Sequence, residues 1–432
     1  MAAKDEEKAA GKAAEEDAAE AEVKEEGKGE AKAEGEAEND GVPEEAAAGA
    51  PEEPGKPKEL EADAAEDPRP KLGAGSVAFH TADTTLNAMP ITDGKLLMTL
   101  TEGGCQYLLA SARANVGVKA GRYMFEAKIV ESLNPIETQS GSGRAPQPRQ
   151  LVRVGVSVAG SSLLLTDGPD GVCFDSEGYF AHEKRRRKVA QKFGHDQTVA
   201  VLLNLDPASP NADTISLFKN GLRVSEPQAL PENLKGKVLY PTVTYKNVTL
   251  KVNFGPAALA PLPFKSRTLA EAAQADVEVR AEPKAADGKC EVLLPVGMPE
   301  QGFFDWVDAF VEKNPGYTEL SDRKIVEWAA KSGIWKLKPQ QGAGGSNGEA
   351  GTKFGIPMLD DSSVHRVFNA IASTQRRNYI VPDLRANLLS EERKDVLRRF
   401  GAADFRRAAI VVMGEPDEEY KTKVQSLLMA GK

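Results

Sequence analysis

The chain has 432 residues, 41% of them hydrophobic, which is enough for two or three cores, and a formal net charge of −10 at pH 7. No apolar run approaches the roughly 20 residues of a membrane-spanning helix, and the first thirty residues are charged, so we expect a soluble intracellular protein without a signal peptide. Cys105, Cys173 and Cys290 form no C-x-x-C pair, which argues against a disulfide framework or zinc site and favours small buried side chains.

The charge is distributed unevenly along the chain. Residues from Met1 to Pro70 include 24 Asp and Glu against 9 Lys and Arg, a net of −15, which leaves +5 on the remainder. Residues 1–72 consist almost entirely of Ala, Glu, Lys, Gly, Asp and Pro, so they bury too little surface to offset their ordering entropy. We therefore expect a disordered acidic tail, acting as an interaction segment, as an internal competitor for the basic body or only as a solubilising spacer.

Residues 73–265 show short runs in which apolar and polar residues alternate, each closed by turn residues. Examples are "RYMFEAKIV", "LVRVGVSVA" and "TLKVNFG", in which every second side chain is apolar. Such runs are typical of half-buried antiparallel strands. Asn220 and Gly221 lie between two apolar runs and predict a hairpin turn. The region is predicted to be an all-β antiparallel sandwich, with the polar insertion "NPIETQSGSGRAPQPRQ" as a surface loop.

A charged, Ala-rich stretch at 266–288 is expected to be a linker, and residues 289–432 predict an α/β domain with a parallel sheet. "CEVLLPV" is typical of a strand buried on both faces, and a helix is expected from Phe303 onward. Ser321 is the expected N-cap of a second helix, whose apolar face includes Trp328. Residues 339–354 predict a flexible insertion. Later, "NYIV" and "AAIVVM" are expected to be strands on either side of the helix "LSEERKDVLRRFG".

The stretch "PVGMPEQGFFDW" lies where the predicted strand meets the predicted helix. Gly297 and Gly302 have the spacing of a phosphate-binding loop, G-x-x-x-x-G-K-[ST], but Phe303 and Phe304 stand where that motif has its lysine and hydroxyl. Neither benzyl group can neutralise phosphate oxygens or bind magnesium, and phosphoryl transfer depends on that charge stabilisation. The stretch is therefore predicted to be a tight strand-to-helix turn, with residual nucleotide binding as the alternative.

The strongest local charge is "KRRRK", Lys184 to Lys188, which we expect to form an exposed loop because five consecutive cations repel one another. The five residues, Lys184, Arg185, Arg186, Arg187 and Lys188, are candidates for contact with an import receptor or with nucleic-acid phosphates, or they form a solvated loop without a partner.

A second basic group in the α/β region comprises Arg376, Arg377, Arg393, Lys394, Arg398, Arg399, Arg406 and Arg407. No aromatic residue is interleaved with either group in the sequence, which argues against base stacking. The four histidines have no metal-ligand spacing, and no catalytic constellation is present.

Stretches of the sequence resemble two domain families, and within each region they follow the order of that family's motifs. "ARANVGVKAGRYMFEAKIVES", "VRVGVSVAGSSLLL", "SEGYF" and "ISLFKNGLRV" resemble a SPRY domain. "CEVLLPVGMPEQGFFDW", "RRNYIVPDLRAN" and "RRFGAADFRRAAIVVMGEPDEEYKTKVQ" resemble the kinase-like P-loop domain that follows SPRY in heterogeneous nuclear ribonucleoprotein U and its relatives. The resemblance implies a vestigial nucleotide site at Gly297, Gly302 and Asp383, with Asp383 in the place of the magnesium-binding acid.

The sequence therefore predicts a non-enzymatic scaffold: an acidic tail, a SPRY sandwich and a degenerate P-loop domain, without catalytic residues, metal or cofactor. The resemblance implies a protein partner bound through SPRY loops, a ribonucleoprotein or RNA in the setting, and a nuclear location, with the cytoplasm as the alternative. Two other functions remain open. One is an active polynucleotide kinase or ATPase using Lys313 or Lys324, and the other is a SPRY substrate adaptor for a ubiquitin ligase.

Overall fold

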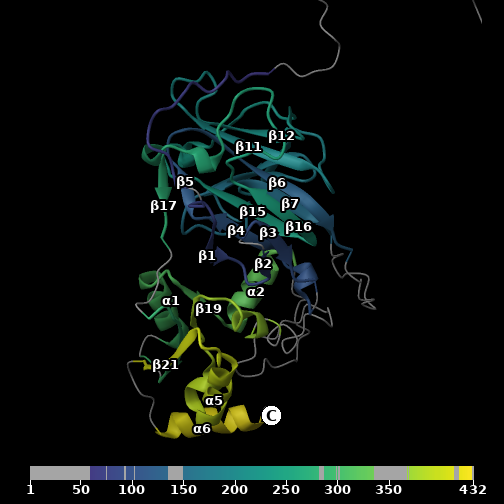
Figure 1. The fold of residues 1–432 in the computed structure, drawn as a ribbon. Helices are drawn as coiled ribbons and strands as arrows, with labels where there is room; N and C mark the ends of the chain where they lie inside the picture. Colours follow the sequence, from purple (N-terminus) through teal and green to yellow (C-terminus); the bar gives the residue numbers. More distant parts are fainter. Residues whose placement is uncertain are drawn as a thin grey trace, which may run out of the picture. The chain divides into compact units, whose positions relative to one another are not determined.

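The computed structural model describes residues 59–430, except 74, 92–93, 102, 135–148, 282–286, 298, 300–301, 335–366, 368 and 413–417. Antiparallel sheets occupy the first part of this range and a parallel sheet the second (Figure 1). Residues 1–58, most of the predicted surface loop and the predicted insertion at 339–354 lie outside the described residues. No helix in the described part of the chain is long and apolar enough to cross a membrane.

The first sheet is antiparallel and seven-stranded. Its order is β1 (Phe79–Thr84), β4 (Ala110–Ala114), β15 (Tyr240–Lys246), β7 (Leu151–Ser157), β8 (Gly171–Asp175), β9 (Tyr179–His182) and β10 (Arg185–Lys188). The central strands are buried along nearly their whole length, whereas β10 is exposed throughout. Among the described residues, the sheet therefore ends in a strand that has a neighbour on one side only.

The second sheet is eight-stranded, and its strands are also paired antiparallel. Its order is β13 (Leu222–Arg223), β12 (Thr214–Lys219), β11 (Thr198–Leu205), β6 (Gly121–Ser132), β16 (Val248–Asn253), β3 (Leu96–Thr99) and β2 (Ala88–Ile91), with β14 (Gln228–Ala229) beside β12. One cluster of buried apolar side chains, including Val154 of the first sheet and Phe125 and Val201 of the second, joins the two inner faces. The predicted antiparallel arrangement is confirmed.

The outer face of the second sheet is less exposed than its alternating pattern predicts. Glu126, expected to face water, is fully buried, and its carboxylate accepts hydrogen bonds from the backbone of Leu259 and Ala260 and from Asn253. Phe264 from the same returning segment packs on Met124 and its neighbours. The segment after β16 thus covers a face that would otherwise be solvated.

Residues 59–72 are packed along the sandwich, whereas the prediction placed them in the tail (purple segment, Figure 1). Glu61 is 7% exposed and pairs with Arg122 of β6, and Glu59 pairs with Arg223 of β13. We call this segment the strap. Its carboxylates meet the half-buried Arg122 and the buried Arg223, a complementarity that its composition does not reveal.

The predicted linker at 266–288 also differs from the structure in its first half. Two short 3-10 helices, η3 (Leu269–Glu271) and η4 (Gln274–Asp276), lead into β17 (Val277–Val279), which pairs with β5 (Val116–Val118). Thr268 and Glu271 form a capping box at η3. Residues 266–280 therefore belong to the sandwich. The remaining 3-10 helices are η1 (Cys105–Tyr107) and η2 (Glu232–Leu234).

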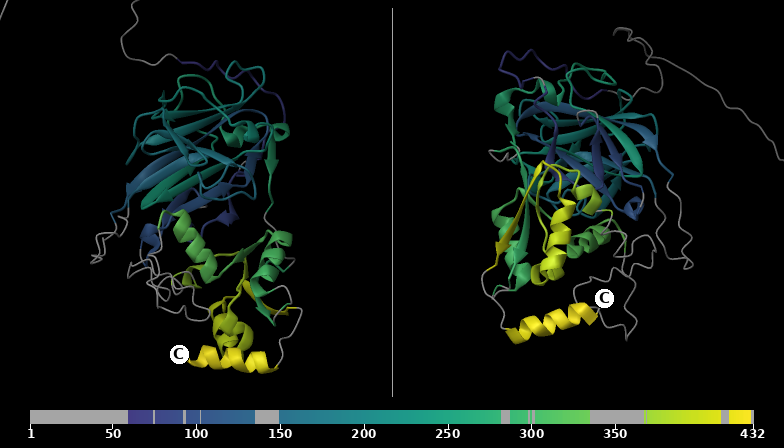
Figure 2. Two further views of the ribbon diagram at one scale, coloured as in Figure 1. Left: turned by 180° about the vertical axis from the view of Figure 1, so that it is seen from behind. Right: turned by 60° about the horizontal axis from the view of Figure 1, so that its bottom comes forward.

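The second part contains a four-stranded, all-parallel sheet with the order β19 (Tyr317–Glu319), β20 (Asn378–Ile380), β18 (Cys290–Val296) and β21 (Phe405–Val411). Of the four strands of this sheet, β18 comes first in chain order and lies in the interior, as its apolar run predicts. The helices in the described part are α1 (Phe303–Lys313), α2 (Asp322–Lys331), α4 (Leu384–Leu388), α5 (Ser390–Arg399) and α6 (Glu418–Ala430). Helix α6 contacts α4 and is the C-terminal yellow helix in both views of Figure 2. The α/β prediction is confirmed at the level of strands and helices.

Helix α2 packs against the sandwich. The indole Nε1 of Trp328 donates to the backbone oxygen of Leu109 at 2.8 Å, and Ala329 lies in one buried cluster with Tyr107 and Leu108. Ser321 occupies the predicted N-cap position, but its hydroxyl bonds the side chain of Glu319 instead of the helix backbone. Trp328 therefore belongs to an apolar contact between the two parts.

Candidate functional sites

Gly297 follows β18 directly, at the carboxyl end of the parallel sheet. In open α/β sheets, ligands bind in the crevice outside the carboxyl ends of the strands, where neighbouring connections run in opposite directions. Strand β18, between β20 and β21, is at such a position. Both glycines of the predicted turn have left-handed backbones, with φ of 95° at Gly297 and 98° at Gly302, and Gly302 is the N-cap residue of α1. The structure thus places the turn where a phosphate loop would lie.

Asn387 of α4 occupies the backbone groups of Gly297. The Gly297 N–H donates to Asn387 Oδ1 at 2.7 Å, and Asn387 Nδ2 donates to the Gly297 oxygen at 2.7 Å. Asn387 is 4% exposed, and Arg393 holds the end of α4 by donating to the oxygens of Ala386 and Asn387. A side chain of this protein therefore saturates the backbone N–H that could otherwise face an anion.

Phe303 and Phe304 are in the first turn of α1. Phe303 is 5% exposed, and Phe304 lies under the guanidinium of Arg323, 4.6 Å from its carbon to the ring centre. Arg323 is itself paired with Glu319 at 2.7 Å and with Asp308 at 2.6 Å. The cation over the Phe304 ring thus already has two carboxylate partners.

Asp383 lies after β20, at the carboxyl end of the sheet. Its Oδ1 accepts from the backbone N–H groups of Arg385 and Ala386, at 2.9 and 3.0 Å, so it is the N-cap of α4. Helix α4 links Asp383 to Gly297. Asp383 caps the start of this helix, and Asn387 of the same helix binds Gly297. In this arrangement the Asp383 carboxylate caps a helix.

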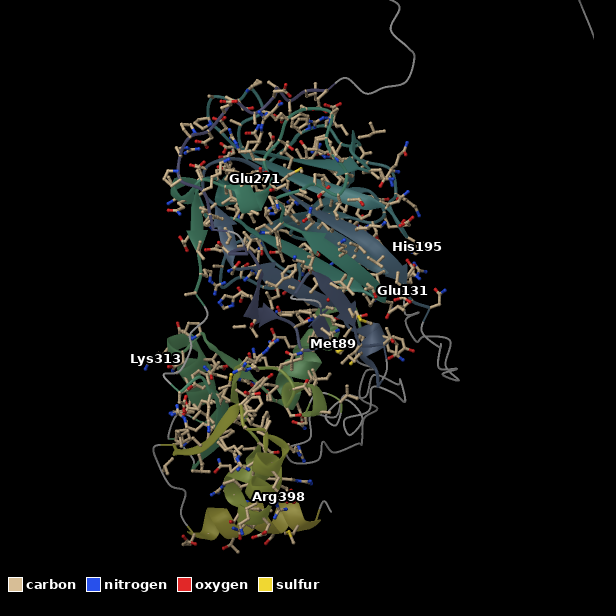
Figure 3. The ribbon with its side chains drawn as sticks, viewed as in Figure 1. Met89, Glu131, His195, Glu271, Lys313 and Arg398 are labelled. Carbon is tan, nitrogen blue, oxygen red and sulfur yellow. The ribbon has the colours of Figure 1, made fainter. Side chains whose placement is uncertain are left out.

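An active kinase or ATPase would need Lys313 or Lys324 to replace the missing lysine of the turn. Lys313 is at the last position of α1 (Figure 3), about 15 Å along the helix axis from its start. Lys324 of α2 pairs with Glu327 at 3.1 Å. Neither replaces the missing lysine in this structure.

The basic run is a strand and not the predicted loop. Arg185–Lys188 forms β10, which pairs with β9 through a two-residue turn in which Glu183 is left-handed, with φ of 53°. The like charges are tolerated because an edge strand directs its side chains to both faces of the sheet and because some have partners. Arg186 Nη2 lies 2.6 Å from Asp175, and Arg187 Nη2 donates to Gln228 at 2.5 Å.

An aromatic ring accompanies the basic strand, contrary to the expectation from the linear sequence. Tyr179 of β9 lies directly opposite Lys188, and both Arg186 and Lys188 lie over its ring, at 4.4 and 5.0 Å from its centre. The sequence hides this ring because it lies on the partner strand.

Members of the second basic group are engaged within the protein. Arg377 is buried and donates to the oxygen of Thr84, and Arg398 pairs with Asp395 on the exposed side of α5. Lys394 pairs with Glu391. Of these three cations, one is buried and the other two are paired within helix α5.

The cysteines match the prediction of small buried side chains at two of three positions. Cys105 and Cys173 are buried, and burial raises the pKa of each thiol to about 12, while Cys290 is half-buried. Among the described residues, no group of three or more His, Cys, Asp or Glu side chains is arranged to hold a metal ion.

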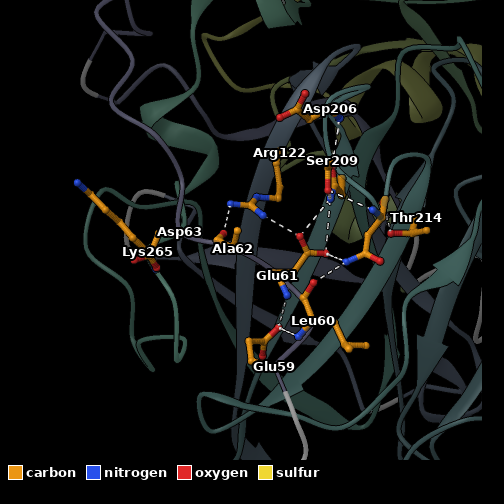
Figure 4. Close-up of polar contacts among 12 residues, drawn as sticks. Glu59, Leu60, Glu61, Ala62, Asp63, Arg122, Asp206, Ser209, Thr214 and Lys265 are labelled. Carbon is orange, nitrogen blue, oxygen red and sulfur yellow. Dashed lines mark hydrogen bonds and ion pairs between the residues drawn. The ribbon is translucent and has the colours of Figure 1, made fainter.

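Three features were missed by sequence reasoning. Asn387 carries no motif, Tyr179 is distant in sequence from the cations it contacts, and the Glu61 pocket joins residues far apart in the chain. In that pocket the carboxylate receives hydrogen bonds from Arg122, Asn204 and Asn211 (Figure 4). The only signal in the sequence for the Glu61 pocket is Leu60, an apolar residue between two glutamates in a segment with few apolar side chains other than Ala.

Comparisons with known proteins give sequence relatives but no family model that matches. Heterogeneous nuclear ribonucleoprotein U-like protein 2 of Mus musculus is 25% identical over 331 residues, which cover 74% of this chain and 40% of that protein. Its counterpart of the same name in Homo sapiens is 24% identical over 326 residues. The ATP-dependent RNA helicase Ddx1 of Drosophila melanogaster is 28% identical over 144 residues, 33% of this chain and 17% of that protein.

Solved structures similar to this chain include the SPRY domain of human HERC1 and another human SPRY domain. They are 20% and 19% identical, cover 41% and 40% of this chain and 97% and 98% of their own, and each has a TM-score of 0.29. This chain spans about two fifths of the length of the ribonucleoprotein U-like relatives. A match over 74% of the chain exceeds the sandwich, so this protein resembles the heterogeneous nuclear ribonucleoprotein U-like proteins across both its antiparallel and its parallel-sheet parts.

Proposed function

We propose that this chain is a non-enzymatic adaptor whose SPRY-type sandwich binds a protein partner within a nuclear ribonucleoprotein. The observation that carries the proposal is the closed turn after β18. Asn387 engages both backbone groups of Gly297, and Phe303 and Phe304 stand where a phosphate loop has its lysine and hydroxyl. A turn arranged in this way lacks the groups with which phosphoryl transfer stabilises charge.

The ribonucleoprotein setting is supported by the names of the relatives. Both proteins matched over 74% of the chain are ribonucleoprotein U-like, and the helicase matched over a third is named for RNA. We carry over from them the setting, a nuclear location and association with RNA or with a ribonucleoprotein. Because this chain spans only 40% of the U-like relatives, their other activities are not part of the proposal.

The parallel-sheet part is proposed to descend from a P-loop kinase-like domain. An all-parallel sheet whose first strand lies in its interior and runs into a glycine turn and a helix supports this origin. Gly297, Gly302 and Asp383 are then the remains of a nucleotide site, now serving a turn and a helix cap. We place the boundaries of the sandwich at residues 59–280 and those of the second domain at 289–432.

Calorimetric titration of Mg-ATP into the full chain tests the proposal. We expect no binding to the natural sequence at Kd below about 1 mM. The variant Phe303→Lys with Phe304→Thr restores the two missing groups, and adding Asn387→Ala frees the Gly297 N–H, so any gain in binding should be larger in the triple variant.

The thermal unfolding midpoint of each variant is the control, since Asn387 is buried and its loss also removes two hydrogen bonds. Binding of Mg-ATP by the natural chain, followed by turnover, would overturn the proposal in favour of the kinase or ATPase alternative. If the natural chain, the double variant and the triple variant all fail to bind Mg-ATP, the adaptor role is not contradicted, but the phosphate-loop origin of the turn is rejected.

A further inference from the structure

We propose that the free edge of β10 binds an extended acidic peptide segment of a partner protein, which adds to the seven-stranded sheet as a further strand. This inference rests on the proposed adaptor function and names the surface and the kind of partner for it. Its test uses a peptide and no nucleotide, so the inference and the proposed function can fail independently.

The backbone of β10 has two positions directed away from the sheet. In the register with β9, Arg185 lies opposite His182 and Arg187 opposite Phe180. The N–H of Val189 donates to the oxygen of Gly178, at 3.1 Å. Because facing pairs in an antiparallel ladder alternate between hydrogen-bonded and non-hydrogen-bonded, the pairs formed by Arg186 and Lys188 are of the second kind.

The N–H and C=O groups of Arg186 and Lys188 therefore point to the free edge. No backbone partner for either residue occurs in the described part of the chain. These four groups have the spacing of a strand edge that another strand can join.

The side chains of this edge select for acidic partners. All four residues of β10 are exposed, as is Lys184 of the turn. Lys184 and Arg185 have no ion pair with any described residue. Arg186 is shared between Asp175 and the ring of Tyr179, which fixes its position at the edge.

The edge is also preorganised. The ring of Tyr179 supports both Arg186 and Lys188, the Lys188 ammonium donates to the oxygen of Glu177, and Arg187 is held by Gln228. Side chains already held in place lose less conformational entropy on binding. The surface therefore needs little rearrangement to accept a strand.

A peptide fits this edge better than nucleic acid does. Phosphate oxygens only accept hydrogen bonds, so an RNA backbone bound through its phosphates could use the outward N–H groups and the cations but would leave the outward C=O groups of Arg186 and Lys188 facing anions. A peptide strand supplies donors and acceptors in alternation and satisfies both. Acidic side chains on that strand would meet Lys184 and Arg185.

The test compares two substitutions at one position in the full chain. Lys188→Ala and Lys188→Pro both remove the charge, but only proline removes the outward N–H, and proline is tolerated at an edge position whose N–H faces solvent. The probe is a fluorescein-labelled peptide of alternating Glu and Val, about eight residues long, followed by fluorescence anisotropy.

We expect the natural chain to bind the probe and Lys188→Pro to bind about fivefold more weakly than Lys188→Ala, the effect of one backbone hydrogen bond. A second probe with methyl groups on alternate backbone nitrogens cannot add as a strand, so it should bind much more weakly to the natural chain. This arm needs no variant and remains decisive if the proline substitution disturbs folding.

Three outcomes would overturn the inference. Equal affinities of the two Lys188 variants, together with equal affinities of the two probes, would mean that charge alone holds the peptide. Absence of binding would mean that the cations only protect the edge from pairing. Tighter binding of a uridine oligonucleotide than of the peptide would assign the strand to RNA.

Discussion

At the scale of single residues, buried polar side chains decide what the chain can and cannot bind. Asn387 closes the turn at Gly297, and Glu61 fixes the strap by accepting from Arg122 at 2.7 Å with a side chain that is 1% exposed. Buried polar groups are stable only when their partners are present. Each of these residues should therefore be sensitive to a change that leaves its shape intact.

Glu61→Gln tests the carboxylate of the strap. The substitution keeps the size of the side chain but leaves the guanidinium of Arg122, whose side chain is 12% exposed, without its counter-charge. We expect a loss of about 2 kcal/mol in the free energy of unfolding, measured by denaturant unfolding of the full chain. Glu66→Gln, at an exposed position of the same strap, makes the same charge change and should have almost no effect. Equal effects of the two would mean that the strap is held by overall charge and not by this pocket.

At the scale of elements, local signals predicted those structures that depend on neighbouring residues. The hairpin at Asn220 and Gly221 is present between β12 and β13, with φ of 50° and 81° at the two positions, because only such residues adopt this backbone readily. The repulsion of like charges predicts a loop for the basic run. Its actual state, an edge strand, depends on Asp175 and Tyr179, which a local pattern does not contain.

Gly221→Ala tests the hairpin. A Cβ at this position would lie 2.4 Å from the oxygen of Pro261, in addition to the strain of a left-handed backbone. Gly236 has a similar φ of 71° but open space around it, so Gly236→Ala measures the backbone strain alone. We expect Gly236→Ala to cost about 1 kcal/mol and Gly221→Ala about 3 kcal/mol, compared by thermal unfolding. The idea fails if the two substitutions cost the same.

At the scale of the whole molecule, the sandwich is completed by segments from both of its ends. Asp276 of η4 accepts from Arg69 of the strap at 2.7 Å and from Tyr123 of β6 at 2.7 Å. Burial alone would raise the pKa of Asp276, but the hydrogen bonds from Arg69 and Tyr123 outweigh it and hold the pKa below its ordinary value. One carboxylate thus ties together three segments that lie far apart in the chain.

The depressed pKa of Asp276 predicts a pH dependence of stability. A carboxylate with a lowered pKa stabilises the folded chain above its unfolded pKa of about 3.9, and this contribution is lost as the pH falls through the folded value. Asp276→Asn should reduce stability by about 2 kcal/mol at neutral pH, and its difference from the natural chain should shrink below about pH 4. Thermal unfolding from neutral to acidic pH measures this, with the exposed Asp404→Asn as control. A difference that does not change with pH would reject the role of the charge.

The sequence by itself determined the two kinds of sheet, the hairpin turn, the strand and helix on either side of Gly297, and the absence of the phosphate-loop lysine and hydroxyl. These follow from periodicity and from residues adjacent in the chain. Only the tertiary structure decided the rest: that residues 59–72 and 266–280 pack on the sandwich, that β10 is an edge strand with Tyr179 beneath its cations, and that Asn387 seals the turn. Each depends on charge pairs or hydrogen bonds between residues distant in sequence, whose partners become neighbours only once the sheets have formed.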